Sequence, residues 1–186
     1  MGRVAGLTLL EILLALGMLG VLLSVALTDM SDWTQAVRAR QITRSLATQV
    51  ALARSTAAAQ QQSVSLCPTL DQLGCGGSWS RGSMVFSDRN GDRRVNQDDI
   101  VIRVQGPLPA GETLRWRAFQ SRPYLQIEAS GFMRHQSGNF TWCPASRDVR
   151  FARQLVVNAT GRVRMSQDSD GDGIHEDSAG NPLACP

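Results

Sequence analysis

The chain has 186 residues and a formal net charge of +3, and all nineteen of its basic residues are arginines. This length is enough for one compact core, and so small a net charge does not identify a class of partner. No nucleophile pattern or glycine-rich phosphate loop accompanies the two histidines, which excludes the common enzyme classes, and the four cysteines lack zinc-ligand spacing.

The N-terminal segment is strongly apolar. From Leu7 to Leu27 every residue is apolar or small apart from Glu11. As a helix rising 1.5 Å per residue it covers about 31 Å, the thickness of a bilayer core. Because no small-residue cleavage site follows it, we expect a retained helix that crosses the membrane once.

Glu11 needs a partner, because an ionised carboxylate is costly within an apolar span. Cleavage after Gly6 would create an α-amino group on Leu7, four residues before Glu11, and this group can neutralise the carboxylate of a neighbouring subunit. The run from Gly6 to Glu11, Gly-Leu-Thr-Leu-Leu-Glu, resembles the class III leader of type IV pilins. A plain signal anchor is the alternative interpretation.

The rest of the chain predicts an α+β fold. Residues 29–62 keep apolar side chains at helical spacing without glycine or proline, and Trp33, Val37, Ile42 and Leu46 begin the stripe that we expect to pack on a sheet. After residue 62 the pattern changes to short strands separated by turns, which is typical of an antiparallel sheet. The candidate strands are 63–67, 83–87, 100–105, 113–118, 124–129, 140–143, 154–158 and 162–165.

An even number of cysteines in a small exported domain indicates two disulfides. Three connectivities are possible, and we favour Cys67 with Cys75 and Cys143 with Cys185. The second bond would pin the C-terminal tail to the sheet.

Several motifs of the β region are similar to those of the GspH/FimT minor pilins. They are Trp79-x-x-Gly82-x-x-Val85-Phe86-x-Asp88, Gly131-Phe132, Phe140-x-x-Cys143 and Leu155-Val156-Val157-Asn158-x-x-Gly161-Arg162-Val163-Arg164.

With the leader, this resemblance implies a type IV pilin-like fold in which a long helix packs on an antiparallel β domain. Residues 1–6 would be the leader removed by a prepilin peptidase, 7–28 the membrane-spanning and assembly half of the helix, 29–62 its amphipathic half and 63–186 the β domain. Leu7 would be N-methylated and Glu11 would act in assembly with other major and minor pilins. The protein would reside in the bacterial inner membrane and then in an extracellular or periplasmic pilus.

Gly161-Arg162-Val163-Arg164 places two guanidiniums on one face of a strand after a glycine turn. Paired arginines suit phosphates and would bind DNA independently of sequence. The motif is similar to the one with which FimT-type pilins bind DNA during natural transformation. Arg147, Arg150 and Arg153 could extend the basic track, but a solvated edge strand explains such arginines equally well.

Two acidic loops resemble calcium loops, which would be the only cofactor sites. Asp88, Asn90, Asp92 and Asp99 carry oxygen ligands at suitable spacing, but Arg93 replaces the turn glycine. The second loop keeps that glycine, and its candidate ligands are Asp168, Asp170, Asp172 and Glu176, but Ala179 stands at the position of the last ligand. A plain hairpin or surface loop is the alternative interpretation of each loop. The second loop follows the arginine pair closely, so it could also fold over the pair and mask it.

The sequence therefore favours a minor type IV pilin that binds DNA for uptake in natural transformation. The alternative is a structural minor pilin or type II secretion pseudopilin that primes pilus assembly without binding nucleic acid. No catalytic activity is expected.

Overall fold

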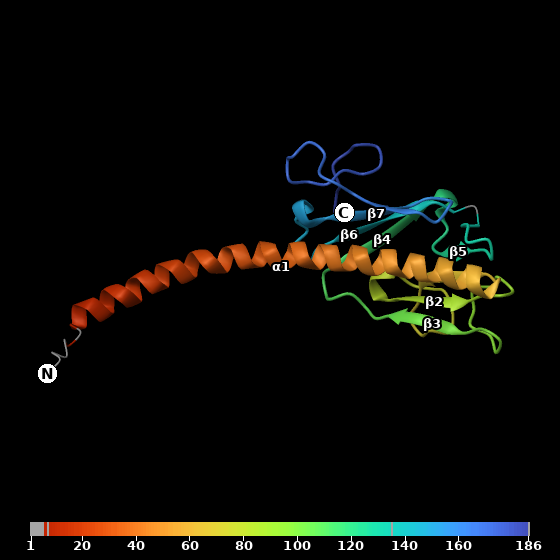
Figure 1. The fold of residues 1–186 in the computed structure, drawn as a ribbon, viewed down its shortest axis with the longest axis horizontal. Helices are drawn as coiled ribbons and strands as arrows, with labels where there is room; N and C mark the ends of the chain where they lie inside the picture. Colours follow the sequence, from red (N-terminus) through yellow and green to blue (C-terminus); the bar gives the residue numbers. More distant parts are fainter. Residues whose placement is uncertain (1–5, 7, 135, 186) are drawn as a thin grey trace. The chain divides into compact units, whose positions relative to one another are not determined.

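The computed structural model describes every residue except 1–5, 7, 135 and 186, and for 23–29 and 119 it describes the backbone alone. One helix, α1, runs from Leu9 to Gln60 (Figure 1). The chain divides into two units, one ending at Val37 and one beginning at Arg38, and each is described by itself.

The N-terminal unit consists of the first half of α1. The Thr8 hydroxyl accepts a hydrogen bond of 3.3 Å from the backbone N–H of Glu11, a helix cap that places this carboxylate in the first turn. The capping role of Thr8 was not predicted from the sequence.

The apolar side chains of this half are exposed, including Leu9 at 77% and Leu22 at 68%. No helix built from the described residues is long and apolar enough to cross a membrane. The expected span 7–28 includes Leu7 and side chains that lie outside the described residues, so membrane insertion stays a prediction, as does the processing of Gly6 and Leu7.

The second half of α1 forms the core of the larger unit, as the periodicity predicts. Its buried stripe consists of Ala39, Ile42, Leu46, Val50, Ala53 and Ala57. Trp33 and Val37, which we assigned to the same stripe, are 64% and 42% exposed. They belong to the N-terminal unit, so the packed face begins later than the sequence pattern suggests.

Two four-stranded antiparallel sheets, rather than one, make up the β region. The first sheet has the order β3-β2-β1-β5 and the second has the order β4-β6-β7-β8. Their strands are β1 (Val64–Pro68), β2 (Ser83–Ser87), β3 (Val101–Gln105), β4 (Thr113–Ala118), β5 (Leu125–Ile127), β6 (Gly138–Cys143), β7 (Arg153–Val157) and β8 (Val163–Met165). All eight coincide with the predicted segments to within a few residues.

Strands β1, β2 and β5 of the first sheet are buried on both faces, whereas its edge strand β3 is largely exposed. On one face, Ser83 donates a hydrogen bond of 2.9 Å to Gln49 of α1. On the other, Cys67, Met84 and Phe86 form a fully buried cluster. Cys75 of loop 69–77, Val95 of loop 88–99 and Tyr124, which precedes β5, pack against this cluster. The Cys67–Cys75 disulfide closes loop 69–77.

The second sheet buries one face through aromatic packing. Trp79 meets Phe140 edge-on with ring centroids 4.7 Å apart, and Trp116 lies 4.4 Å from the same ring. Arg38 of α1 pairs with Glu112 at 3.0 Å, and Glu112 also accepts a hydrogen bond from the Trp142 indole. The Cys143–Cys185 disulfide, in the pairing that we favoured, joins this sheet to the C-terminal tail, which we define as residues 167–185.

Candidate nucleic-acid interface

The predicted arginine motif lies on the turn between β7 and β8. The side-chain oxygen of Asn158 accepts hydrogen bonds from the backbone N–H groups of Thr160 and Arg162, at 3.1 and 2.9 Å. The backbone N–H of Gly161 donates to the Asn158 carbonyl, which closes the turn. Asparagine favours such turns because its short side chain replaces a backbone acceptor. These bonds fix the backbone position of Arg162, directly before β8.

Gly161 is required there for two reasons. Its φ of +72° lies in the left-handed region, where a side chain is strained. A Cβ at this position would also contact the side chain of Arg54, which would have to move. Arg54 approaches this closely because its guanidinium donates to the carbonyls of Gly161 and Gly131, both at 3.2 Å. Helix α1 thus anchors the turn, a contact that the sequence pattern did not indicate.

Arg162 and Arg164 are both exposed. Within the described part of the chain, neither guanidinium has a hydrogen bond or ion pair. Arg164 pairs across the ladder with Val156, so its side chain lies on the face of the second sheet opposite the aromatic core. The two cations are therefore available to a ligand.

The three arginines expected to extend this track are placed elsewhere. Arg150 pairs with Asp148 at 2.6 Å and lowers the pKa of that carboxyl through its hydrogen bonds. Arg153 donates to the carbonyls of Arg150 and Ala152, and burial lowers its pKa, with a further contribution from Arg40. Arg147 donates to Thr113. All three lie at the end of β7 away from the turn, so the structure does not gather them with Arg162 and Arg164.

Two other arginines share the sheet face with Arg164. Ladder register aligns Arg117, Asn139, Val156 and Arg164 in one row across all four strands. A neighbouring row contains Arg115, Thr141 and Gln154. We call this face the outer face of the second sheet. Sequence analysis missed Arg115 and Arg117, although their two-residue spacing within a strand, the same signal as at Arg162 and Arg164, could have identified them.

The tail lies against this outer face (Figure 1). One cavity of about 490 Å³ is lined by Arg115, Arg117 and Asn139 from the sheet, and by Asp177 and Pro182 from the tail. A second, of about 340 Å³, contains Arg164 together with Asp170, Glu176 and Asp177 of the tail, and both cavities include Gln154. The acidic tail therefore lies next to Arg164, but it does not mask the arginine pair, because Arg162 and Arg164 are both exposed.

Comparison with known proteins identifies the family. The model of the family described as type II transport protein GspH matches residues 43–161. This match covers more than half of the chain. The chain belongs to the GspH family. This family comprises minor pilins and pseudopilins of the GspH/FimT kind.

Individual relatives agree with this assignment. The pilin-like protein PilA1 of Thermus thermophilus is 44% identical over 91 residues, which are 49% of this chain and 53% of that protein, so the match spans about half the length of the curated relative. The crystal structure of the Pseudomonas aeruginosa type IV minor pilin FimU has a TM-score of 0.58 at 17% identity, covering 83% of this chain and 99% of that one. The minor pseudopilin EpsH of the Vibrio cholerae type II secretion system has a TM-score of 0.51 at 14% identity, covering 74% and 99%. At such low sequence identities, the two structures show that this chain shares their fold, and they do not assign its function.

The two acidic loops of this protein differ in how they use their carboxylates. Ligand oxygens of Asp168, Asp170, Asp172 and Glu176 all lie within 4.8 Å of one another, and Glu176 is the least exposed of the four. These are positions 1, 3, 5 and 9 of a calcium loop, with Gly173 at position 6. The arrangement fits the predicted ligand set, and calcium binding stays a prediction.

In loop 88–99, by contrast, the carboxylates stabilise the loop itself. Asp88 is fully buried and accepts from the Ser65 hydroxyl at 2.6 Å and from the Gln126 amide at 3.3 Å. Hydrogen bonds from Asn96 and the Arg94 backbone lower the pKa of Asp92. Asp99 accepts from the backbone N–H of Asn96. Arg93 adopts a φ of +63° where a calcium loop has glycine.

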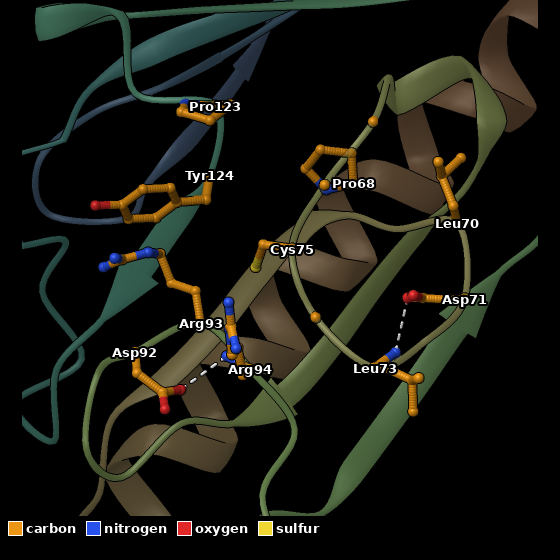
Figure 2. A pocket seen from close by; sticks show the side chains of 13 residues that line it. Pro68, Leu70, Asp71, Leu73, Cys75, Asp92, Arg93, Arg94, Pro123 and Tyr124 are labelled. Carbon is orange, nitrogen blue, oxygen red and sulfur yellow. Dashed lines mark hydrogen bonds between the residues drawn. The ribbon is translucent and has the colours of Figure 1, made fainter.

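A third cavity, of about 560 Å³, lies between loops 69–77 and 88–99 (Figure 2). Arg93 extends beneath the Tyr124 ring, with its Cζ 4.9 Å from the ring centroid. Asp71 and Asp92 accept from the backbone N–H groups of Leu73 and Arg94, at 3.0 and 2.8 Å. Both carboxylates thus stabilise the conformations of the loops to which they belong. The cavity brings together no nucleophile and base among the described residues.

Proposed function

We propose that this protein is a minor pilin that binds DNA through the β7–β8 turn and takes part in DNA uptake for natural transformation. The observation that supports the proposal is the state of Arg162 and Arg164, two exposed guanidiniums without partners among the described residues. They follow a turn that Arg54 and Asn158 hold in place.

Each guanidinium presents a planar fork of N–H groups that fits two phosphate oxygens. Binding would be independent of base sequence and strongly dependent on salt, because each contact with a phosphate releases counterions. The fixed turn matters because it limits the conformational entropy lost when the ligand binds.

Assembly partners complete the proposal. We infer that prepilin peptidase cuts after Gly6, that Leu7 is then methylated, and that Glu11 pairs with a neighbouring major or minor pilin. The exposed apolar side chains between Leu9 and Leu22 supply a surface for such packing or for the inner membrane before assembly. A structural minor pilin without DNA binding shares all of these properties, so only the arginines distinguish the two roles.

The test measures fluorescence anisotropy of labelled duplex DNA with the full chain in a nonionic detergent, from 50 to 200 mM salt. The variant is Arg162→Ala with Arg164→Ala. The control is Arg81→Ala with Arg103→Ala, which removes the same charge from exposed positions near the first sheet. We expect the slope of log affinity against log salt to fall by about 1.8 in the variant, since each phosphate contact contributes about 0.9. Equal effects in variant and control, or no binding by the intact chain, would favour the assembly role.

A further inference from the structure

Beyond Val37, one aromatic side chain is exposed among those that the structure describes. It is Phe132, which is 53% exposed and lies in the segment between β5 and β6. The other described aromatic rings of this unit are buried or half-buried. A single exposed apolar side chain is ordinary in a folded domain, so exposure alone implies no function. The surroundings of Phe132 decide what it can do.

The backbone around Phe132 is fixed on both sides. The N–H of Gly131, which has a φ of +80°, donates to the Glu128 carbonyl at 2.8 Å. The Glu128 N–H in turn donates to the Phe132 carbonyl at 2.9 Å. The next residue, Met133, is buried and forms a β-bridge with Ile127. The exposed ring therefore projects from a defined turn, which we call the 128–133 turn.

Arg54 joins the 128–133 turn to the turn that carries the arginine motif. Its guanidinium donates from Nε to the Gly131 carbonyl and from Nη1 to the Gly161 carbonyl, both at 3.2 Å. Phe132 and Arg162 are the residues that directly follow these two glycines. One guanidinium thus holds together the two backbone positions from which an exposed ring and an exposed cation emerge.

The two turns expose no other large apolar side chain among their described residues. A further hydrogen bond of 3.0 Å, from the Met133 N–H to the Ala159 carbonyl, links them. Their other exposed residues are small, polar or cationic, namely Ser130, Asn158, Ala159, Thr160 and Arg162. A docking surface for another protein would need a wider apolar patch around the ring. An isolated aromatic ring beside cations is instead typical of sites that stack on bases and contact phosphates.

We propose that Phe132 stacks on an unpaired DNA base while Arg162 binds a phosphate of the same or the adjacent nucleotide. This inference rests on the proposed function and names the form of DNA that the site favours. A nucleotide carries an aromatic base and an anionic phosphate on one sugar, so a ring and a cation on adjoining turns match its two parts. Within a duplex both faces of each base are covered by neighbouring bases, and uncovering one is costly. The site therefore favours single strands and frayed duplex ends.

The ring and the arginines contribute to binding in separable ways. A guanidinium that contacts a phosphate releases counterions, so its removal lowers the salt dependence of binding. The Phe132 ring is uncharged, so its removal should weaken binding by the same factor at every salt concentration. Stacking also accepts any base, so the ring adds affinity without adding sequence specificity.

The experiment compares two DNA molecules with the full chain in nonionic detergent, from 50 to 200 mM salt. One is a single strand without self-complementary sequence, and the other is a duplex closed at both ends by hexaethylene glycol linkers, which leaves no unpaired base. The variants are Phe132→Ala, Phe132→Leu, which keeps apolar bulk, and Phe132→Tyr, which keeps the aromatic face. The matched control is Leu73→Ala, which removes an exposed apolar side chain from loop 69–77. A 2-aminopurine in the single strand reports stacking through the loss of its fluorescence.

We expect Phe132→Ala and Phe132→Leu to weaken single-strand binding at least fivefold, since stacking on one base contributes about fivefold or more. The salt slope should stay unchanged, and so should affinity for the closed duplex. Phe132→Tyr and Leu73→Ala should bind as the wild type does, and only chains with an aromatic residue at position 132 should quench 2-aminopurine.

Three results would overturn the stacking role while leaving DNA binding by Arg162 and Arg164 intact. They are unchanged single-strand affinity in Phe132→Ala, an equal loss on both DNA molecules, and a lower salt slope in that variant, which would show that the ring only supports the arginine turn. A wild-type chain that binds neither DNA molecule would overturn the proposed function as well.

Discussion

The two sheets of this protein are covered in different ways. Loops 69–77 and 88–99 bury apolar residues against Cys67, Met84 and Phe86 of the first sheet, and the two loops bond to each other between Cys75 and Arg93 and between Val95 and Leu73. The tail lies beside polar and charged residues of the second sheet, of which Arg115, Arg117 and Arg164 are exposed, and it buries only Leu183 among its own described residues. The first cover belongs to the hydrophobic core, whereas the tail leaves cavities between itself and the second sheet. The contrast indicates that the first cover contributes more to the stability of the fold than the tail does.

The largest effect should come from the first sheet. Phe86→Ala removes a fully buried aromatic ring beneath the first cover, and we expect it to lower the free energy of unfolding by about 3–5 kcal/mol. Arg117→Ala, at an exposed position on the outer face of the second sheet, should change it by less than about 0.5 kcal/mol. Urea unfolding of the two variants measures the difference. Similar costs would mean that the outer face of the second sheet is also part of the core.

Gly161→Ala should have the next largest effect, because it strains the turn that carries the arginines. We expect a loss of about 1–3 kcal/mol from the positive φ and from the contact with Arg54. In an Arg54→Ala background the steric part should vanish and the backbone part remain, so the two substitutions should not be additive. Full additivity in urea unfolding would show that Arg54 does not press against the turn.

The next prediction concerns calcium binding, which should occur in the tail and not in loop 88–99. We expect any site to lie in the tail, with a dissociation constant on the order of 0.1–1 mM, as in extracellular calcium modules. Asp172→Asn should weaken calcium binding at least tenfold, whereas Asp92→Asn, in the loop that covers the first sheet, should leave it unchanged. Isothermal titration of both variants with calcium, after treatment with a chelator, measures this. If only Asp92→Asn abolished the heat of calcium binding, the site would lie in loop 88–99, and the prediction would be wrong.

The smallest effect concerns Arg150, which is tied to Asp148 near the second sheet. The hydrogen bonds from Arg150 lower the pKa of Asp148, so the pair stabilises the fold above the ordinary carboxyl pKa of 3.8 and loses this contribution as the pH falls below it. Because the pair is partly exposed, Arg150→Ala should cost less than about 1 kcal/mol at pH 7 and less still at pH 3. DNA affinity should not change, and thermal unfolding and anisotropy test the two expectations.

The sequence was a good guide to local structure. Strand positions followed from alternating apolar residues and from turn residues, and for β2 and β4 the expected limits were the observed ones. The helix stripe from Ile42 to Ala57 followed from its spacing. Such patterns depend on residues that are close in the sequence, so they can be recognised without knowledge of the tertiary fold.

Contacts between distant segments were not predictable in this way. The division into two sheets depends on the pairing of β1 with β5 across sixty residues, which no short pattern encodes. The salt bridge of Arg38 with Glu112 and the clamp of Arg54 on Gly161 connect residues that have no sequence signal for each other. For the same reason Arg147, Arg150 and Arg153 resembled a continuation of the basic track until their local bonds were known.

The most direct test of the contrast between the two covered sheets is photo-crosslinking to DNA. A benzoyl-phenylalanine at Thr160 would lie on the exposed β7–β8 turn, and one at Gln97 on the exposed loop that covers the first sheet. Full chains carrying either label are irradiated with duplex DNA at low salt, and the crosslinked fraction is measured. We expect crosslinking from position 160, its loss at high salt, and little from position 97. Equal crosslinking from both positions, or crosslinking from position 97 alone, would contradict the assignment of DNA binding to the second sheet.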